Sequence, residues 1–326
     1  MTDNYDIALV VGTRPNFVKA APLLNKLEEQ NKKVLFIHTG QHFDENMSKN
    51  IFDDLSMRAP DINLNATSDS QSKQFQYIVE ELQKIFKNCN IGKIGVFGDV
   101  TSTLAASIAA KQSEIFLFHV ESGLRSNNLS MPEERNRIMV DAISDLLLIP
   151  SEDARENLLK ERVSSDKIHN VGNIMIDTLF KNKSKIIHKS ENIKDTLNIN
   201  KPYFVITLHR PSNLNYDTLK DIFEAISNFT QDYQVILPAH PRLKYYIDNN
   251  NIDHRNIILI DPLSYIDFMS LVYGCDLVLT DSGGIQEETT YLGINCLTLR
   301  EETERPITVQ EGTNKVIGTD KENIIN

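Results

Sequence analysis

Short apolar runs of strand length alternate with amphipathic stretches of helical period along almost the whole chain. The strands expected from this pattern are residues 7–11, 34–38, 94–97, 115–119, 146–149, 203–208, 234–237, 257–260, 277–279 and 296–299. The helices expected between them are residues 16–30, 72–88, 101–112, 133–143, 152–161, 218–229, 243–249, 265–272 and 285–292. Such alternation predicts an α/β fold with parallel sheets that are covered by helices on both faces.

The alternation forms two series, which predict two doubly wound, Rossmann-like domains. We expect an N-terminal domain at residues 1–172 and a C-terminal domain at residues 173–326. A polar stretch at about 181–200 predicts a connecting helix plus loop between them. Ligands of open α/β sheets bind beyond the carboxyl ends of the strands, so residues just after each strand are the functional candidates.

Composition narrows the class of protein. The 326 residues are 40% hydrophobic, enough for real cores, and the longest apolar runs are strand-sized. The N-terminus has no basic segment followed by an apolar one, which predicts a cytoplasmic protein without membrane insertion. A net charge of −11 argues against a nucleic-acid partner. Three cysteines without a Cys-x-x-Cys pair argue against a disulfide framework or a structural zinc site.

The stretch from Asp281 to Glu288 is the most informative in the chain. An apolar strand there breaks at Ser282-Gly283-Gly284 and restarts as a helix, which leaves backbone N–H groups that could hold phosphate oxygens. Glu288, about one turn further on, could accept hydrogen bonds from sugar hydroxyls. These features predict a site for a nucleotide-sugar diphosphate, with an ordinary glycine-containing turn as the alternative.

Charged residues follow the strands of the first series. Arg14 and Lys19 open the first helix, where they suit an anionic substrate, and the alternative is that Arg14 simply pairs with a carboxylate. Asp99, Glu121 and Glu133 bring carboxylates to the same sheet edge, where mutual repulsion would raise their pKa values and permit acid and base roles. The alternatives are a helix N-cap for Asp99 and a helix-dipole position for Glu133 or Glu134.

The second series ends its strands in histidine and arginine. His209-Arg210 and His240 are placed for proton transfer and phosphate binding, and their spacing does not suit a metal. The charged segment from Leu299 to Pro306, which contains Arg305, is either a solvated turn or a ligand clamp.

Taken together, these segments resemble the non-hydrolysing UDP-N-acetylglucosamine 2-epimerase family from Val10 to about Gly318. The motifs that carry the resemblance, in family order, are Gly12-Thr13-Arg14-Pro15, Thr39-Gly40-Gln41-His42, Gly98-Asp99, His119 to Ser126, Pro132 to Arg137, Val171-Gly172-Asn173, His209-Arg210, Asp281 to Glu288 and Thr303-Glu304-Arg305-Pro306.

The resemblance implies a two-domain GT-B-type fold with the active site in the interdomain cleft, a homodimer, and no cofactor or metal. It implies reversible epimerisation at C2 of UDP-N-acetylglucosamine through anti elimination of UDP, a 2-acetamidoglucal intermediate and re-addition, for surface or capsular polysaccharide synthesis. The implied catalytic residues are Asp99, Glu121, Glu133 and His209. The implied substrate-binding residues are Arg14, Lys19, His209, Arg210, His240, Ser282, Gly283, Gly284, Glu288 and Arg305.

The sequence also departs from the best-known bacterial members. Pro211-Ser212-Asn213 and Phe43-Asp44 replace residues near a second UDP-N-acetylglucosamine site that activates those enzymes. An activating second ligand is therefore an open expectation, carried by Gln41, Asp44, Glu133, Arg210 and His240. Relatives also continue into a C-terminal helix, which we expect to be missing from a chain that ends at Asn326.

Three other functions compete with this one. A hydrolysing epimerase would release N-acetylmannosamine and UDP, although Thr13-Arg14-Pro15 resembles the non-hydrolysing branch. An inverting GT-B glycosyltransferase would use the Ser282-Gly283-Gly284 site for its donor, but the carboxylates favour elimination. A catalytically dead nucleotide-sugar sensor is opposed by the retained acid and base residues.

Overall fold

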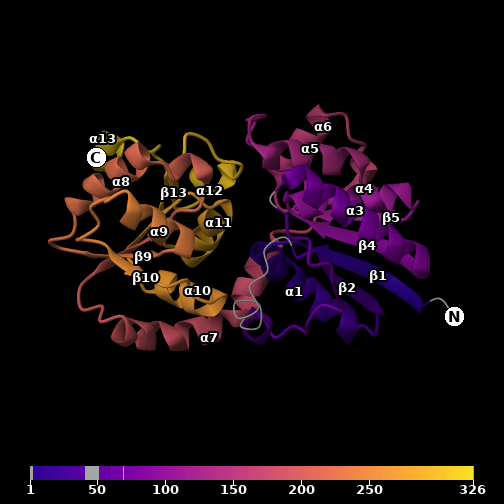
Figure 1. Cartoon of the computed structure of the whole chain (residues 1–326), viewed down its shortest axis with the longest axis horizontal. Coiled ribbons are helices and arrows are strands. Elements are labelled where there is room, and N and C mark those ends of the chain that lie inside the picture. Colours follow the sequence, from indigo (N-terminus) through magenta and orange to yellow (C-terminus); the bar gives the residue numbers. More distant parts are fainter. Residues whose placement is uncertain (1–2, 41–50, 69, 326) are drawn as a thin grey trace. The chain divides into compact units, whose positions relative to one another are not determined.

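The computed structural model describes residues 3–40, 51–68 and 70–325 (Figure 1). The chain divides into two compact units, Met1–Thr178 and Leu179–Asn326. Helix α7 (Ile174–Thr196) contributes residues to both units. In the described part of the chain, no helix is both long and apolar enough to cross a membrane.

The first unit is built on a seven-stranded, fully parallel sheet with the order β3-β2-β1-β4-β5-β6-β7. Its strands are β1 (Asp3–Val11), β2 (Val34–His38), β3 (Ile62–Asn63), β4 (Cys89–Phe97), β5 (Phe116–Val120), β6 (Leu146–Ile149) and β7 (Ile168–Asn170). Its helices before α7 are α1 (Arg14–Glu29), α3 (Gln71–Asn88), α4 (Thr101–Gln112), α5 (Pro132–Ile143), α6 (Glu152–Lys160) and the 3₁₀ turn η1 (Ser165–Lys167). The strand order reverses between β1 and β4.

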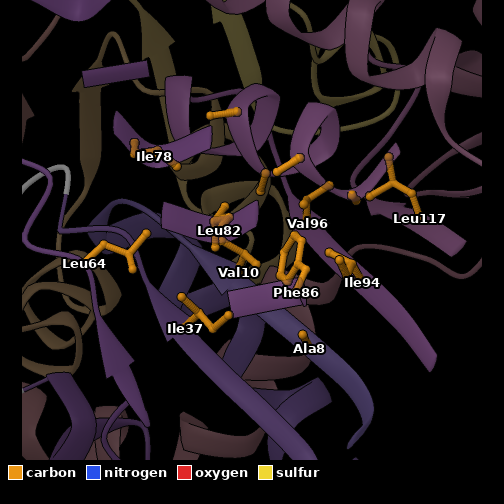
Figure 2. Close-up of a cluster of buried hydrophobic side chains, with 14 of the residues drawn as sticks. Ala8, Val10, Ile37, Leu64, Ile78, Leu82, Phe86, Ile94, Val96 and Leu117 are labelled. Atoms are coloured by element: carbon orange, nitrogen blue, oxygen red, sulfur yellow. The ribbon is translucent and has the colours of Figure 1, made fainter. Parts of the chain in front are cut away.

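Successive side chains of β2 point to opposite faces of this sheet and show how both faces are covered. Leu35 and Ile37 point into the apolar cluster that β1, β4 and β5 form with helices α3, α4 and α5, as Figure 2 shows for Ile37. Phe36 and His38 point to the opposite face, where their rings lie 6.1 Å and 4.9 Å from that of Phe17 on α1. Two-sided burial explains why these strands read as continuous apolar runs.

The second unit has a six-stranded parallel sheet with the order β10-β9-β8-β11-β12-β13, which reverses between β8 and β11. Its strands are β8 (Tyr203–Thr207), β9 (Gln234–Pro238), β10 (Ile258–Ile260), β11 (Leu277–Thr280), β12 (Asn295–Thr298) and β13 (Asn314–Val316). Its helices are η2 (Pro211–Asn213), α8 (Tyr216–Ser227), α9 (Pro241–Asn249), α10 (Tyr265–Tyr273), α11 (Gly283–Leu292), α12 (Pro306–Gln310) and α13 (Lys321–Ile325). Buried Phe223, Leu237 and Leu279 belong to its main apolar core.

Two doubly wound α/β units confirm the predicted fold class. The pattern missed β3, β7, β13 and the short helices α12 and α13, because two to five residues carry too little periodicity to be recognised. The expected connecting helix plus loop at about 181–200 is confirmed, because α7 continues to Thr196 and an irregular segment follows it. Ile186 and Ile193, seven residues apart on this helix, are 0% and 9% exposed, and their burial stabilises helix where the composition looked polar.

Candidate active site

The ends of β1 and β4 meet where the strand order of the first sheet reverses, the position at which doubly wound sheets bind ligands. Asn16, in the first turn of α1, ties these two strand ends together. Its Oδ1 accepts hydrogen bonds from the N–H groups of Gly12 (3.1 Å) and Thr13 (3.2 Å), and its Nδ2 donates to the Phe97 carbonyl (3.1 Å). The start of α1, with half-buried Arg14, is thereby fixed beside the Gly98-Asp99 turn.

Lys19 and Glu121 form a buried ion pair at this edge. The Lys19 Nζ lies 2.7 Å from the Glu121 Oε2, and the two side chains are 9% and 4% exposed. Glu121 follows β5 with a φ of +68°, a left-handed conformation that is uncommon for a glutamate. Its N–H and that of Ser122 both donate to the Leu148 carbonyl, at 3.0 Å and 3.2 Å, which holds the chain in this conformation.

Asp99 is held by helix α5. Arg137 Nη2 lies 2.6 Å from the Asp99 Oδ2, and Asn136 Nδ2 donates to the Asp99 carbonyl at 2.8 Å. The N-cap of α4 is Val100, so the alternative role of Asp99 as a helix cap is wrong. Arg137 lies inside α5, as the helix expected at residues 133–143 implies, but its contact with Asp99 could be recognised only from the fold.

Asp99 and Glu121 each have a cation as partner, an arrangement that favours the ionised carboxylate. These ion pairs oppose the mutual repulsion that the sequence suggested for the gathered carboxylates. Lys19 also lies close to the Asp99 turn, since a Cβ at Gly98 would be 3.0 Å from its Nζ. The structure thus brings Lys19, Glu121 and the turn before Asp99 together.

The adjacent residues Glu133 and Glu134 occupy different environments in the first turn of α5. Glu134 is 1% exposed and accepts hydrogen bonds from the N–H groups of Ser126 and Asn127, each at 2.9 Å. It also lies 2.7 Å from Arg137. Glu134 therefore stabilises the loop after β5. The half-buried Glu133 lies in the first turn of α5, the helix-dipole position given as its alternative, and its acid or base role stays a prediction.

In the second unit, β8 and β11 meet where the strand order reverses, and His209 and Asp281 follow them. The His209 Nδ1 lies 2.5 Å from the Asp281 Oδ1, and the His209 side chain is 59% exposed. Asp281 also accepts the N–H groups of His209 (3.0 Å) and Arg210 (2.9 Å). Burial tends to raise the pKa of Asp281, but the hydrogen bonds and charge of His209 and the backbone amides hold it below the usual value. Asp281 was not expected as a site residue, although its position after a buried strand was a signal.

The expected strand-to-helix junction is confirmed, because β11 ends at Thr280 and α11 begins at Gly283 after the N-cap Ser282. A buried carboxylate lies at this helix start, which the sequence did not indicate. A Cβ on Gly283 would be 2.5 Å from the Glu304 Oε1. Glu304 lies 2.8 Å from Arg300 and 3.4 Å from Arg210, whose Nε also donates to the Asp281 carbonyl.

The segment from Leu299 to Pro306 is not a solvated turn. Arg300, Glu304 and Arg305 are 7%, 3% and 4% exposed, and the Arg305 Nε lies 2.8 Å from the Glu287 Oε2. Thr303 helps to hold the segment, because its hydroxyl donates to the Gln286 Oε1 at 2.6 Å and accepts the Arg305 N–H at 3.0 Å. These contacts suit a preformed clamp that presents arginines.

Glu288, 1% exposed, accepts a hydrogen bond of 2.7 Å from the Tyr265 hydroxyl. Burial, followed by the Glu288 charge, raises the pKa of Tyr265 well above its usual value, so the phenol remains a donor. Sequence reasoning missed Tyr265, which lies 23 residues earlier on α10. His240 is exposed after β9, and Gln41 and Asp44 lie outside the described residues.

The chain is similar to known proteins over almost its whole length. A family model described as UDP-N-acetylglucosamine 2-epimerase matches residues 25–326. The chain is 38% identical to the UDP-N-acetylglucosamine 2-epimerase of Methanococcus maripaludis, over 99% of this chain and 90% of that protein. It is 33% identical to a UDP-2,3-diacetamido-2,3-dideoxy-D-glucuronate 2-epimerase of Pseudomonas aeruginosa, over 98% of this chain and 90% of that protein. The crystal structure of the Methanocaldococcus jannaschii UDP-GlcNAc 2-epimerase in complex with UDP-GlcNAc and UDP matches with a TM-score of 0.91 and 38% identity, over 98% of this chain and 91% of that chain.

Proposed function

The chain belongs to the UDP-N-acetylglucosamine 2-epimerase family, and we propose on this basis that it interconverts UDP-N-acetylglucosamine and UDP-N-acetylmannosamine without net hydrolysis. The observation that carries the proposal is the pair of cation-bound carboxylates, Asp99 and Glu121, at the edge of the first sheet where the strand order reverses. The product would serve polysaccharide synthesis.

The chemistry of the sugar restricts the route. The C2 proton lies beside a carbon that bears an amide nitrogen, not beside a carbonyl, so no enolate can stabilise its direct removal. Elimination avoids this difficulty, because the C2–H and C1–O bonds break, a C1=C2 double bond forms, and UDP departs with the bonding electrons. Return of UDP, with the proton delivered to the opposite face of C2, gives the epimer.

The first unit supplies groups that can handle this proton. Asp99 beside Arg137 and Glu121 beside Lys19 are favoured in the ionised form that accepts a proton. Glu133, half-buried in the first turn of α5, is the third acid or base of the set. In the second unit, Asp281 orients His209, which we assign to proton handling or phosphate contact.

The second unit supplies groups that suit the leaving UDP. Backbone N–H groups of Gly283 and Gly284 at the start of α11 are suited to diphosphate oxygens, whereas the Ser282 N–H already donates to the Thr280 hydroxyl at 3.0 Å. Arg305 and Arg210 stand in the same region, tied to Glu287 and Glu304, where they suit the charge that develops on the diphosphate. Arg14 and Lys19 of the first unit keep their assignment to an anionic substrate. Glu288, oriented by Tyr265, would accept hydrogen bonds from the ribose hydroxyls.

The experiment that tests the function is product analysis by NMR after incubation with UDP-N-acetylglucosamine in D2O. We expect UDP-N-acetylmannosamine with deuterium at C2, because the proton taken by a carboxylate exchanges with solvent. Asp99→Asn and Glu121→Gln should slow turnover about 10²-fold or more, the scale of a lost general acid or base. Glu29→Gln, an exposed position on α1, is the matched control and should leave the rate unchanged.

Other products would identify the competing functions. Free N-acetylmannosamine with UDP would indicate the hydrolysing reaction, and sugar transfer to an added acceptor would indicate a glycosyltransferase. Because a relative is named for a diacetamido-glucuronate, the UDP form of that sugar should be tested beside UDP-N-acetylglucosamine. Epimerised product without solvent deuterium, together with normal rates in both variants, would contradict the elimination mechanism.

An activating second UDP-N-acetylglucosamine stays an expectation. Glu133, Arg210 and His240 are described, with Arg210 tied to Asp281 and Glu304, whereas Gln41 and Asp44 lie outside the described residues. A sigmoidal dependence of rate on substrate, or stimulation by traces of UDP-N-acetylglucosamine when the reaction starts from the epimer, would support it.

A further inference from the structure

A row of alternating charges, buried except for the exposed Glu161 at its end, lies beneath the ends of β4 and β5. His119 on β5 is 0% exposed, and its Nδ1 lies 2.7 Å from the Asp141 Oδ1 of α5. Its Nε2 lies 2.8 Å from the Gly98 carbonyl oxygen. The other carboxylate oxygen of Asp141 lies 2.8 Å from Arg125, which in turn makes two hydrogen bonds of 2.7 Å to Glu161.

The partners of His119 determine how many protons its ring must carry. The Gly98 carbonyl can only accept, so the Nε2 must donate to it. The Asp141 carboxylate also accepts, since Arg125 and the Gly123 N–H occupy its second oxygen. Both hydrogen bonds form together only if both ring nitrogens are protonated, which makes the ring an imidazolium.

The surrounding charges are compatible with this state. Two cations, His119 and Arg125, alternate with two anions, Asp141 and Glu161, so that the row is neutral as a whole. Although burial would raise the pKa of Asp141, the charges and hydrogen bonds of His119 and Arg125 hold it below the usual value. A protonated Asp141 donating to a neutral His119 is disfavoured by geometry, because the second oxygen of Asp141 lies 2.8 Å from Arg125 and accepts the Gly123 N–H at 3.0 Å.

This row connects the two segments that carry the proposed proton-handling groups. The Gly98 carbonyl, bound by His119, belongs to the peptide that leads into Asp99. Asp141 accepts the N–H of Gly123 at 3.0 Å, two residues after Glu121. Gly98 and Gly123 have φ values of +63° and +80°, a left-handed conformation that glycine adopts readily and that these hydrogen bonds select in each turn.

We propose that His119 is a positioning residue, which acts as a buried imidazolium clamp between Gly98 and Asp141. The clamp keeps the carboxylates of Asp99 and Glu121 in a fixed position relative to each other. The proposal rests on the proposed function, in which these two carboxylates handle the C2 proton. His119 does not touch the reacting atoms. It acts through the Gly98 peptide, and Asp141 carries its effect to the loop after β5.

Two amide substitutions separate the two halves of the clamp. His119→Gln can place its NH2 group near the position of Nε2 and keep a donor toward Gly98, while His119→Asn keeps a donor near Nδ1, toward Asp141. Both remove the charge. We expect His119→Asn to lower kcat about 10²-fold with little change in KM, the scale of a misplaced catalytic group, and His119→Gln to retain most of kcat. In an Asp99→Asn background, neither substitution should lower the rate further.

Measurements without turnover keep this inference separate from the proposed function. In ¹⁵N-histidine NMR, the His119 signal, identified by its loss in both variants, should show protons on both ring nitrogens. Hydrogen exchange should report faster opening of the Gly98 N–H, which donates to the Val120 carbonyl at 3.1 Å, in His119→Asn than in His119→Gln.

A bare ring nitrogen in the wild-type protein, or equal exchange at Gly98 in the two variants, overturns the clamp whether or not the protein is active. Equal kcat for the two variants overturns its role in positioning Asp99. Absence of epimerisation by the wild-type protein would instead contradict the proposed function, while the NMR and exchange measurements still decide the clamp.

Discussion

Removing Lys19 should destabilise the first unit far more than removing another lysine of the same helix. In Lys19→Met the chain keeps the volume of the side chain but leaves Glu121 without its cation, in a site where that carboxylate side chain is 4% exposed. Lys26, on the same helix, pairs with Glu29 at 3.2 Å, but those side chains are 68% and 62% exposed. The two lysines therefore form a matched pair of experiments on one helix.

The size of the destabilisation expected for Lys19→Met follows from the geometry of the ion pair. At 2.7 Å the attraction between Lys19 and Glu121 is about 6 kcal/mol for an effective dielectric constant of about 20. Desolvation of both ions offsets much of this, so the net worth of the pair is smaller. Leaving one buried ion unpaired costs about 3 to 5 kcal/mol, whereas an exposed pair is worth about 0.5 kcal/mol or less.

The assay is a double-mutant cycle measured by denaturant unfolding. Lys19→Met, Glu121→Gln and the double variant are compared with Lys26→Met, Glu29→Gln and their double variant. Because the chain has no tryptophan, unfolding is followed by far-ultraviolet circular dichroism. If the two units unfold in separate transitions, only the transition of the first unit should move.

We expect a coupling energy of about 2 to 3 kcal/mol for Lys19 and Glu121 and about 0.5 kcal/mol or less for Lys26 and Glu29. Equal coupling in the two cycles would refute the argument that burial makes the first pair strong. Destabilisation by Glu121→Gln alone, with none by Lys19→Met, would show that Glu121 relies on its other contacts.

Further predictions concern UDP binding and pH. Glu288→Ala should weaken UDP binding by about 1 to 3 kcal/mol in calorimetric titration, whereas the exposed Glu311→Ala should not, and an unchanged dissociation constant for Glu288→Ala would contradict the ribose assignment. Gly283→Ala places a Cβ 2.5 Å from the Glu304 Oε1, so it should weaken UDP binding and lower the free energy of unfolding by about 1 to 3 kcal/mol. Unchanged binding and stability would mean that Glu304 moves freely. Burial lowers the pKa of His38 from 6.5 to about 4, so the unfolded chain binds more protons between these values, and stability should fall by up to about 3 kcal/mol as pH drops through this window. His38→Gln should lack that loss in unfolding curves measured from pH 7 to 4, and parallel pH profiles would exclude His38 as its source.

Local sequence features predict part of this molecule well. The apolar runs are buried on both sheet faces, and the Ser282-Gly283-Gly284 junction needs no tertiary information, because glycines after a strand already mark a turn into a helix. The carboxylates Asp99 and Glu121 could likewise be identified as candidates from their positions directly after strands.

The partners of those candidates could not be found in the same way. Lys19 meets Glu121, and Arg137 meets Asp99, only because β1, β4 and β5 are neighbours in the sheet, an order that no local pattern records. Tyr265 similarly resembles an ordinary core residue of an apolar helix until α11 brings Glu288 to its hydroxyl. The sequence therefore indicates which groups are present at the strand ends, and the strand order determines how they are paired.

The Glu304 carboxylate has a consequence for the ions that the second unit admits. With Glu287 it supplies two carboxylates to Arg210, Arg300 and Arg305, so these arginines already have resident counterions. A chloride or other monovalent anion that binds these arginines has to displace the carboxylates of Glu287 and Glu304. These carboxylates are part of the chain, so their local concentration is always high. A diphosphate brings more charge and several oxygens at once. The cluster is thus built to discriminate against common salt, and UDP affinity should depend only weakly on whether chloride or a bulkier monovalent anion is used at fixed ionic strength.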